Sequence, residues 1–216
     1  WGGRIPYFVG AALAGTVWLA RSTREESPDF EALNQTGDLA GNPLAHAVSQ
    51  QWGGLLRTFA ISALGSITYY VGITYAPAFL STTGSIGEAD TLWLSTIAAV
   101  AVLLVTPLVG LLSDRFGRRP ALLALAGLSA VLPISLFSLM AGGSFGRALL
   151  GAVVLALVAG GMSAVGAIAT GEQFEEKSRA SGLGLGYTAA TVIFGGLTPY
   201  LAQRLVDATG APQMPG

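Results

Sequence analysis

Six long apolar runs dominate this sequence, and polar segments separate each run from the next. A helix of about 20 apolar residues spans the roughly 30 Å hydrocarbon core of a membrane. The predicted spans run from Ile5 to Leu19, Leu55 to Leu80, Leu92 to Leu112, Pro120 to Met140, Ala148 to Ala169 and Leu183 to Val206. With 52% hydrophobic and only 11% charged residues, the chain cannot give a soluble domain a charged surface. The sequence therefore predicts an all-α membrane protein with six transmembrane helices.

The polar segments define the organisation of the chain. Residues 1–20 form the first predicted helix, residues 21–52 a long polar connector, residues 53–206 the other five helices, and residues 207–216 a tail. The connector has no sustained apolar period, which predicts a loop with room for one short surface helix. The chain starts at Trp1, and no basic segment with a cleavage site precedes its first apolar run, so we expect a piece of a longer protein.

Basic residues predict how the helices are oriented. If the six spans alternate in direction, eight of the eleven Lys and Arg residues fall on one side and three on the other. Cytoplasmic segments of membrane proteins carry the excess of basic residues. The segments 21–52, 113–119 and 170–181 are therefore predicted to be cytoplasmic, and both ends of the chain to be external.

The rare side chains exclude several kinds of site. The sequence has no cysteine, and its one histidine, His46, lies in the polar connector. No metal site is therefore expected, whether built from thiolates or from histidines. Ser129 and Ser163 stand near glycines, as in an intramembrane serine hydrolase, but such a nucleophile needs a base and no predicted span contains a histidine. A net charge of −1 with scattered arginines argues against nucleic acid as a partner.

The segment from Gly110 to Pro120, GLLSDRFGRRP, is a compact charged stretch between two apolar runs. Its charges must lie in water while its flanks do not, which predicts a tight loop at a membrane face. Gly110 would allow close approach to a neighbouring helix, and Gly117 would supply the turn. Pro120 suits the first turn of the next helix, where its missing N–H has no partner to lose.

The charged residues of this loop predict a conformational device. Asp114 can accept a hydrogen bond from Arg115 or Arg118, or cap a helix N-terminus with its carboxylate. Such a cluster can be a latch that holds helix ends together in one state and releases them in another. The predicted latch residues are Gly110, Asp114, Arg115, Gly117, Arg118 and Arg119.

The pattern G-x-x-x-D-R-x-G-R-R in this loop resembles the signature loop of the major facilitator superfamily, a family of secondary transporters. Three further stretches are similar to the metabolite:proton symporter branch of that family, which includes proline, betaine and organic-acid symporters. They are RSTREESPDF at 21–30, SITYYVGITYAPAFL at 66–80 and GLGLGYTAATVIFGGLTP at 182–199. The resemblance covers nearly the whole chain.

The resemblance implies that the six spans correspond to helices six to eleven of a twelve-helix transporter, and residues 21–52 to its central cytoplasmic connector. It implies a multi-pass protein of the bacterial inner (plasma) membrane that moves a small metabolite or osmolyte by proton-coupled symport and alternating access. Its partners would be lipid, a zwitterionic osmolyte or organic acid as substrate, and the N-terminal half of the same transporter. No cofactor is implied beyond protons as the coupling ion. The alternatives are an intramembrane serine hydrolase and a membrane scaffold without transport.

The resemblance also assigns roles to charged residues. In the family, the acidic residue of the signature loop pairs with a helix end in the opposite half, so Asp114 would have its partner outside this chain. Arg115, Arg118 and Arg119 would support the same closed state. In the cytoplasmic loop before the last span this chain reads EEKSR where the family has P-T-x-x-R, so only Arg179 carries over.

Polar residues at membrane depth predict a substrate cavity, because they are costly there unless they are paired or face water. On the second span, Ser62, Ser66, Tyr69, Tyr70 and Ile73 fall in an arc about 100° wide. Tyrosine hydroxyls and π faces suit a carboxylate or a quaternary ammonium, although the same residues could also cross-link helices or lie at the interface. The predicted cavity residues are Ser66, Tyr69, Tyr70, Tyr187, Thr191 and Phe194.

Other residues of the spans have simpler interpretations. Tyr75 and Tyr200 are predicted to lie in an aromatic belt at the outer face, and the glycines of the last two spans to serve helix packing. Arg57 is expected to snorkel to the cytoplasmic face, with contact to an anionic substrate as the less favoured reading. No Asp or Glu lies deep in a predicted span, so this part of the chain holds no proton carrier. The resemblance places the coupling carboxylates in the first half of the transporter.

Overall fold

The computed structural model describes residues 4–22, 43–82, 86–142, 144–211 and 214, which fall into two compact units. The first unit, residues 1–41, contains the helix α1 (Ile5–Ser22). This helix begins where the first span was predicted to begin and ends three residues later than Leu19. Most of the predicted connector, residues 23–42, lies outside the described residues.

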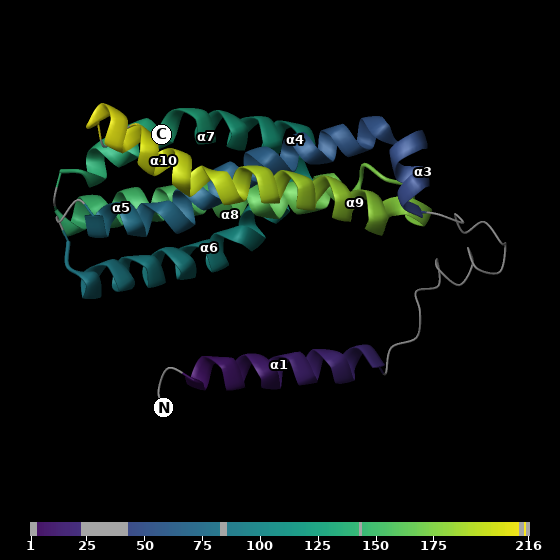
Figure 1. Cartoon of the computed structure of the whole chain (residues 1–216), viewed down its shortest axis with the longest axis horizontal. Coiled ribbons are helices and arrows are strands. Elements are labelled where there is room, and N and C mark those ends of the chain that lie inside the picture. Colours follow the sequence, from purple (N-terminus) through teal and green to yellow (C-terminus); the bar gives the residue numbers. More distant parts are fainter. Residues whose placement is uncertain (1–3, 23–42, 83–85, 143, 212–213, 215–216) are drawn as a thin grey trace. The chain divides into compact units, whose positions relative to one another are not determined.

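The second unit, residues 42–216, contains all the other helices. Figure 1 shows its long helices lying lengthwise beside one another, with the short α3 at one end. No strand occurs in the described parts of the chain, so the predicted all-α class is confirmed. The elements are α3 (Pro43–Gln50), α4 (Trp52–Tyr69), η2 (Tyr70–Tyr75), α5 (Ala76–Thr82), α6 (Glu88–Phe116), α7 (Arg118–Met140), α8 (Phe145–Gly171), α9 (Glu176–Ala190), η3 (Thr191–Gly195) and α10 (Gly196–Thr209).

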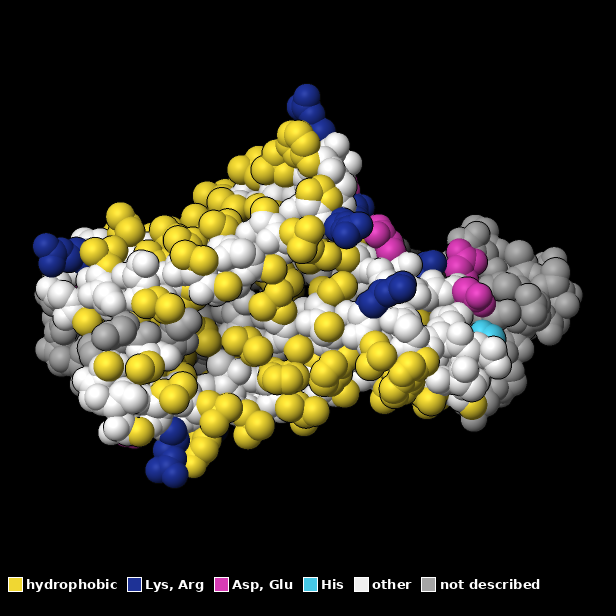
Figure 2. Space-filling view, turned by 90° about the horizontal axis from the view of Figure 1, so that it is seen from above, with side chains coloured by type: hydrophobic (Ala, Val, Ile, Leu, Met, Phe, Trp, Pro, Cys, Tyr) yellow, Lys and Arg dark blue, Asp and Glu magenta, His cyan; other side chains and the backbone are white. Residues whose placement is uncertain are grey.

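Five helical segments among the described residues are long and apolar enough to cross a membrane. They are Trp52–Ser81, Ala89–Phe116, Arg118–Met140, Phe145–Gly171 and Ser178–Thr209. These segments coincide with the second to sixth predicted spans. The first predicted span is helical but is not among the five, so six spans are not confirmed. On the face drawn in Figure 2 many apolar side chains are exposed, as a lipid-facing surface requires.

Three predicted boundaries are corrected by the structure. The segment 113–119 is a sharp elbow in place of a loop, since α6 continues to Phe116 and α7 begins at Arg118. Likewise only residues 172–175 separate α8 from α9, within the predicted loop 170–181. Residue 207, where the tail was predicted to begin, lies inside α10. This helix ends at Thr209, and the next residue, Gly210, has the left-handed backbone conformation. In each case backbone hydrogen bonding carries the helix beyond the apolar run, because polar side chains do not end a helix without a breaker.

The helix α8 lies at the centre of the unit, where it packs against α4, α6 and α7. Two adjacent glycines allow this close approach. A Cβ added at Gly160 would lie 2.6 Å from Val102 Cγ1 on α6, and one added at Gly161 would lie 3.1 Å from Leu125 Cδ2 on α7. The packing role predicted for the glycines of this span is therefore confirmed at these two positions.

Two spans contain a π-helical turn, and a proline follows each turn. Pro77 and Pro199 lack an N–H, and each ring clashes with the carbonyl four residues earlier. Those carbonyls belong to Ile73 in η2 and Gly195 in η3. The wider π turn accommodates the proline without ending the helix. In contrast, Pro107 and Pro133 lie inside uninterrupted α-helices.

An aromatic cluster closes one end of the core. Phe79 and Phe137 meet edge to face with ring centroids 5.2 Å apart, and Tyr75 packs against both. Only 3% of Tyr75 is exposed, and its hydroxyl donates to Gln203 Oε1 at 3.2 Å. The predicted place of Tyr75 in an aromatic belt is thus wrong, because the π turn directs its ring inward, where it links η2 to α10. Tyr200 is exposed, and its place in such a belt stays a prediction.

The glycine contacts predict different outcomes for two Gly→Ala variants. Gly160→Ala forces a methyl group against the stiff side chain of Val102 and should destabilise the protein by about 1–3 kcal/mol. Gly184→Ala is the matched control, because a Cβ there meets nothing within 4 Å. It should be neutral or slightly stabilising, since alanine is the better helix former. Thermal unfolding of the purified protein in detergent measures both, and equal effects would contradict the packing assigned to α8.

Candidate functional site

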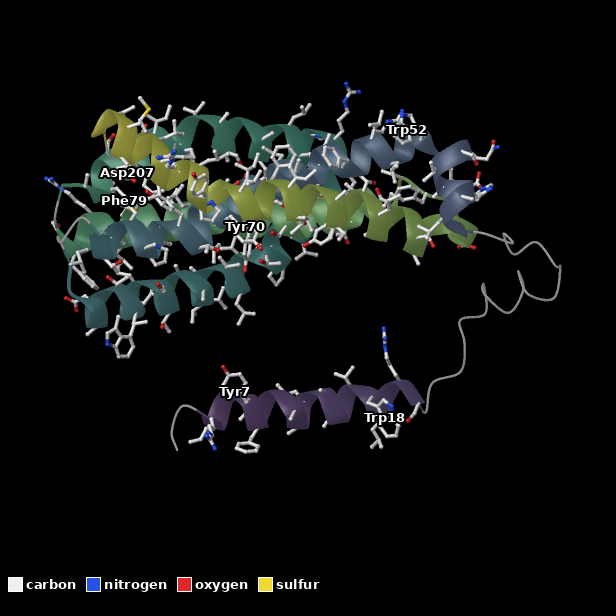
Figure 3. All side chains as sticks on the ribbon, in the orientation of Figure 1. Tyr7, Trp18, Trp52, Tyr70, Phe79 and Asp207 are labelled. Atoms are coloured by element: carbon white, nitrogen blue, oxygen red, sulfur yellow. The ribbon has the colours of Figure 1, made fainter. Side chains whose placement is uncertain are left out.

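A cavity of about 640 Å³ lies between α4, α8 and α9, near the π turns. This volume is within the range of about 300–1,000 Å³ that is usual for small-molecule sites. Figure 3 shows Tyr70, which lines the cavity, roughly midway between Trp52 and Asp207 at opposite ends of the unit. The lining residues are Ile61, Ser62, Gly65, Ser66, Tyr69, Tyr70, Met162, Ser163, Gly166, Ala167, Thr170, Leu183, Tyr187 and Thr191.

The structure brings five of the six predicted cavity residues into one wall. Ser66, Tyr69 and Tyr70 reach it from the second predicted span, and Tyr187 and Thr191 from the sixth. The hydroxyls of Ser66 and Thr191 lie 3.1 Å apart and are hydrogen-bonded. The rings of Tyr69 and Tyr70 meet edge to face with centroids 5.8 Å apart. Their role in binding a substrate stays a prediction.

Phe194 is the predicted cavity residue that does not line the cavity. Its ring packs edge to face against Phe59, with centroids 5.9 Å apart. The prediction used 100° per residue along the whole span, but Phe194 lies in η3, where the wider π turn changes the angular position of each residue. Ile73 in η2 departs from its predicted arc for the same reason and lines a separate small cavity with Pro77.

Residues of α8 complete the wall, and the sequence analysis missed them. Met162, Ser163, Gly166 and Thr170 line the cavity, although the glycines of this span were predicted to serve packing and Ser163 was considered only as a nucleophile. The available signal was the small and polar character of these residues within an apolar run. None of the lining residues is charged. The cavity wall therefore presents hydroxyl groups, aromatic faces and apolar surface, but no charged side chain.

At the elbow between α6 and α7, the guanidinium of Arg118 contacts two carboxylates. Arg118 pairs with Asp114 on the last turn of α6, and its Nε donates to Glu172 Oε1 at 3.2 Å. Its Nη1 also donates to the buried Ser113 Oγ at 3.2 Å. Gly117, with φ of +98°, provides the backbone turn that brings these groups together. Glu172, which the sequence analysis did not identify, ties the elbow to the end of α8.

The other predicted latch residues lie around this cluster in different ways. The guanidinium of Arg115 lies 5.8 Å from the centre of the Phe116 ring, and Arg119 is exposed. A Cβ added at Gly110 would meet nothing within 4 Å, so the described residues provide no helix that approaches it closely. Among the described residues the ion pairs of this cluster therefore join Arg118 with Asp114 and Glu172, and its role as a latch stays a prediction.

Within the second unit, the described parts of the segments predicted to be cytoplasmic lie at one end and contact one another. His46 Nε2 on α3 lies 3.7 Å from Glu175 Oε2, and Ser178 Oγ donates to Gln51 Oε1 at 2.9 Å. Arg179 is exposed in the first turns of α9 beside these contacts. In Figure 2 the cyan histidine and several acidic side chains lie toward the same end. Residues 43–52, 113–119 and 170–181 thus lie on one side, and which side of the membrane this is stays a prediction.

The described residues contain no arrangement that could activate a serine, as the hydrolase alternative would require. Ser163 lines the cavity, but the one histidine of the chain faces Glu175 from α3. Ser129 Oγ donates to the Leu125 carbonyl at 2.8 Å within its own helix. A serine nucleophile needs a base within hydrogen-bond reach, which the described residues do not supply.

The contacts of Arg118 predict that replacing Glu172 lowers the local stability of the first turn of α7. Glu172→Gln weakens one of the two ion pairs of Arg118, so the first turn of α7 should open more often. Because exposed ion pairs are screened by water and contribute little, amide exchange there should rise only modestly, by up to about fivefold. Glu176→Gln is the control, an exposed carboxylate that contacts no arginine among the described residues. Hydrogen exchange with mass spectrometry measures both, and identical exchange in the two variants would contradict the assigned contact.

The comparisons with known proteins agree with this architecture. Residues 58–214 match the family described as Major Facilitator Superfamily. The chain is 32% identical over 208 residues to the alpha-ketoglutarate permease of Escherichia coli, covering 95% of this chain and 47% of the permease. It is 32% identical over 225 residues to the proline/betaine transporter of the same organism, covering 100% of this chain and 45% of that transporter.

A third relative is the citrate-proton symporter of Klebsiella pneumoniae, which is 28% identical over 217 residues and covers 100% of this chain and 48% of the symporter. No solved structure matches the chain. The chain spans about half the length of these relatives, which are transporters and not enzymes. Together with its apolar helices, these matches identify a multi-pass membrane protein. The chain belongs to the Major Facilitator Superfamily, in the metabolite:proton symporter branch that its motifs indicated.

Proposed function

We propose that this chain forms part of a secondary transporter of the bacterial inner membrane, which moves a small metabolite by proton-coupled symport. The observation that carries the proposal is the cavity of about 640 Å³, which has hydroxyl and aromatic side chains in the middle of apolar helices. Polar side chains at membrane depth usually face a solute or water path. The relatives include a permease, a proline/betaine transporter and a citrate-proton symporter, which supports the same function.

The substrate is a small zwitterionic osmolyte or an organic acid. Both classes carry carboxylates that hydroxyl groups such as those of Ser66 and Thr191 can bind. Tyrosine faces such as those of Tyr69 and Tyr70 can also hold an ammonium group. The cavity wall has no acidic side chain, so the group that carries the coupling proton belongs to another part of the transporter.

Transport proceeds by alternating access, in which helices rearrange around a central substrate site. Two features of the chain support this mechanism. The π turns η2 and η3 interrupt the two spans that meet at Ser66 and Thr191, and such turns are common at functional sites. The Arg118 cluster holds the elbow to α8 on the side that we propose to be cytoplasmic, and it is the latch of one state.

Uptake into proteoliposomes tests the function directly. The natural full-length protein is reconstituted and given labelled proline, betaine, alpha-ketoglutarate or citrate under an inward proton gradient. At least one of these solutes should accumulate, and a protonophore should abolish the accumulation. Accumulation that follows a sodium gradient instead would overturn the proton coupling. Failure to transport any metabolite in a wider panel would overturn the proposed function.

The latch predicts a transport defect without a folding defect. Asp114→Asn removes the charge that Arg118 binds, so one conformational state loses stability and the initial rate of uptake should fall by about tenfold. Asp90→Asn, at the opposite end of α6, is the control and should leave uptake near the wild-type rate. Protein amounts in the membrane should be equal in all three proteins. Wild-type uptake by Asp114→Asn would remove the latch from the mechanism.

A further inference from the structure

Two buried hydroxyls on α4 differ from the other hydroxyls of the spans. Serine and threonine in these helices commonly donate to a carbonyl four residues earlier, as Thr68 does to Leu64 at 2.8 Å and Thr170 to Gly166 at 2.8 Å. The hydroxyls of Thr58 and Ser62 are buried and have no hydrogen-bond partner among the described residues. A buried polar group without a partner is destabilising and calls for an explanation.

Ser62 and Thr58 lie one helical turn apart, but only Ser62 lines the cavity. Ser62 lines the cavity and is 6% exposed, and its unpaired oxygen is itself buried. Thr58 is fully buried, and its side chain packs where Gly186 leaves room for it. The two positions therefore separate an unpaired hydroxyl on a residue that lines the cavity from one on a residue that does not.

We propose that the Ser62 hydroxyl is a substrate-binding group that holds the carboxylate of a zwitterion, whose cationic end lies against Tyr69 and Tyr70. This inference rests on the proposed function and selects one of its two substrate classes. It gives the unpaired hydroxyl a partner that is present only when the solute is bound.

The hydroxyls around Ser62 suit one carboxylate. Ser62, Ser66 and Thr191 have three O–H donors in total, and the Ser66–Thr191 hydrogen bond uses one of them. Two donors are left for the two oxygens of a carboxylate. Ser62, Ser66 and Tyr70 follow at intervals of four residues on one face of the span, which places each about 6 Å further along the axis. A small zwitterion can therefore reach from the hydroxyls to the tyrosine rings.

The charge of the wall favours a zwitterion over a dicarboxylate. No lining residue carries a charge, so the wall cannot balance an excess negative charge at membrane depth. A zwitterion brings its own counter-charge, and the π faces of Tyr69 and Tyr70 attract its ammonium end. A dicarboxylate would find no cation for either of its carboxylates among the lining residues.

Binding to the natural full-length protein tests the proposal, with betaine and alpha-ketoglutarate as probes. Betaine should raise the unfolding temperature of the wild-type protein, and Ser62→Ala should weaken betaine binding by about tenfold. Thr58→Val removes a buried, unpaired hydroxyl with little change of shape and should leave betaine binding unchanged. Without a probe, neither variant should unfold at a lower temperature than the wild type, because each loses an unsatisfied group. This readout separates a binding role from a structural one.

Each other outcome overturns the proposal in a different way. Equal betaine binding by Ser62→Ala and the wild type would remove Ser62 from the site and leave the transport function standing. Binding of alpha-ketoglutarate but not of betaine would reject the zwitterion and also leave the function standing. Equal losses in Ser62→Ala and Thr58→Val would assign both hydroxyls a structural role. Failure of any solute to bind or be transported would reject the proposed function and this inference together.

Discussion

The close approach of α8 to its neighbours is the constraint on which the rest of the second unit depends. Lipid is as apolar as a leucine side chain, so helices in a membrane associate through close packing more than through burial from water. Gly160 and Gly161 let α6 and α7 reach the backbone of α8 on one side. Further along the same helix, Ser163, Gly166 and Thr170 face the cavity on another side. The small residues of α8 thus serve both the packing of the helices and the lining of the cavity.

Prolines affect the two other spans that line the cavity. Pro77 and Pro199 each follow a π turn, and the two turns belong to the spans joined by the Ser66–Thr191 hydrogen bond. The π turns direct Tyr75 into the core and turn Phe194 toward Phe59, which leaves Tyr70 and Thr191 beside the cavity. The same π turns allow these spans to bend. The packing of the side chains and the proposed movement therefore both depend on the π turns.

Polar contacts at one end of the unit connect segments that are distant in the sequence. Arg118 joins the elbow of α6 and α7 to α8, while Gln51 and Ser178 join the start of α4 to α9. These side chains are partly exposed or lie at helix ends, where ion pairs are weaker than in a dry interior. Weak contacts suit the proposed latch, because strong contacts would hold a transporter in one conformational state.

The sequence by itself determined the helical class, five of the spans, the elbow at Gly117 and the family, because apolar run length, charge placement and local motifs are properties of neighbouring residues. It also placed Ser66, Tyr69 and Tyr70 on one face, since they lie before or at the start of the π turn. Only the tertiary structure decided the positions of Phe194 and Tyr75, the contact of Arg118 with Glu172, the contribution of α8 and the unpaired hydroxyl of Ser62. The physical reason is that π turns change the helical period, and that contacts such as Arg118 with Glu172 join residues far apart in the chain, which no local pattern specifies.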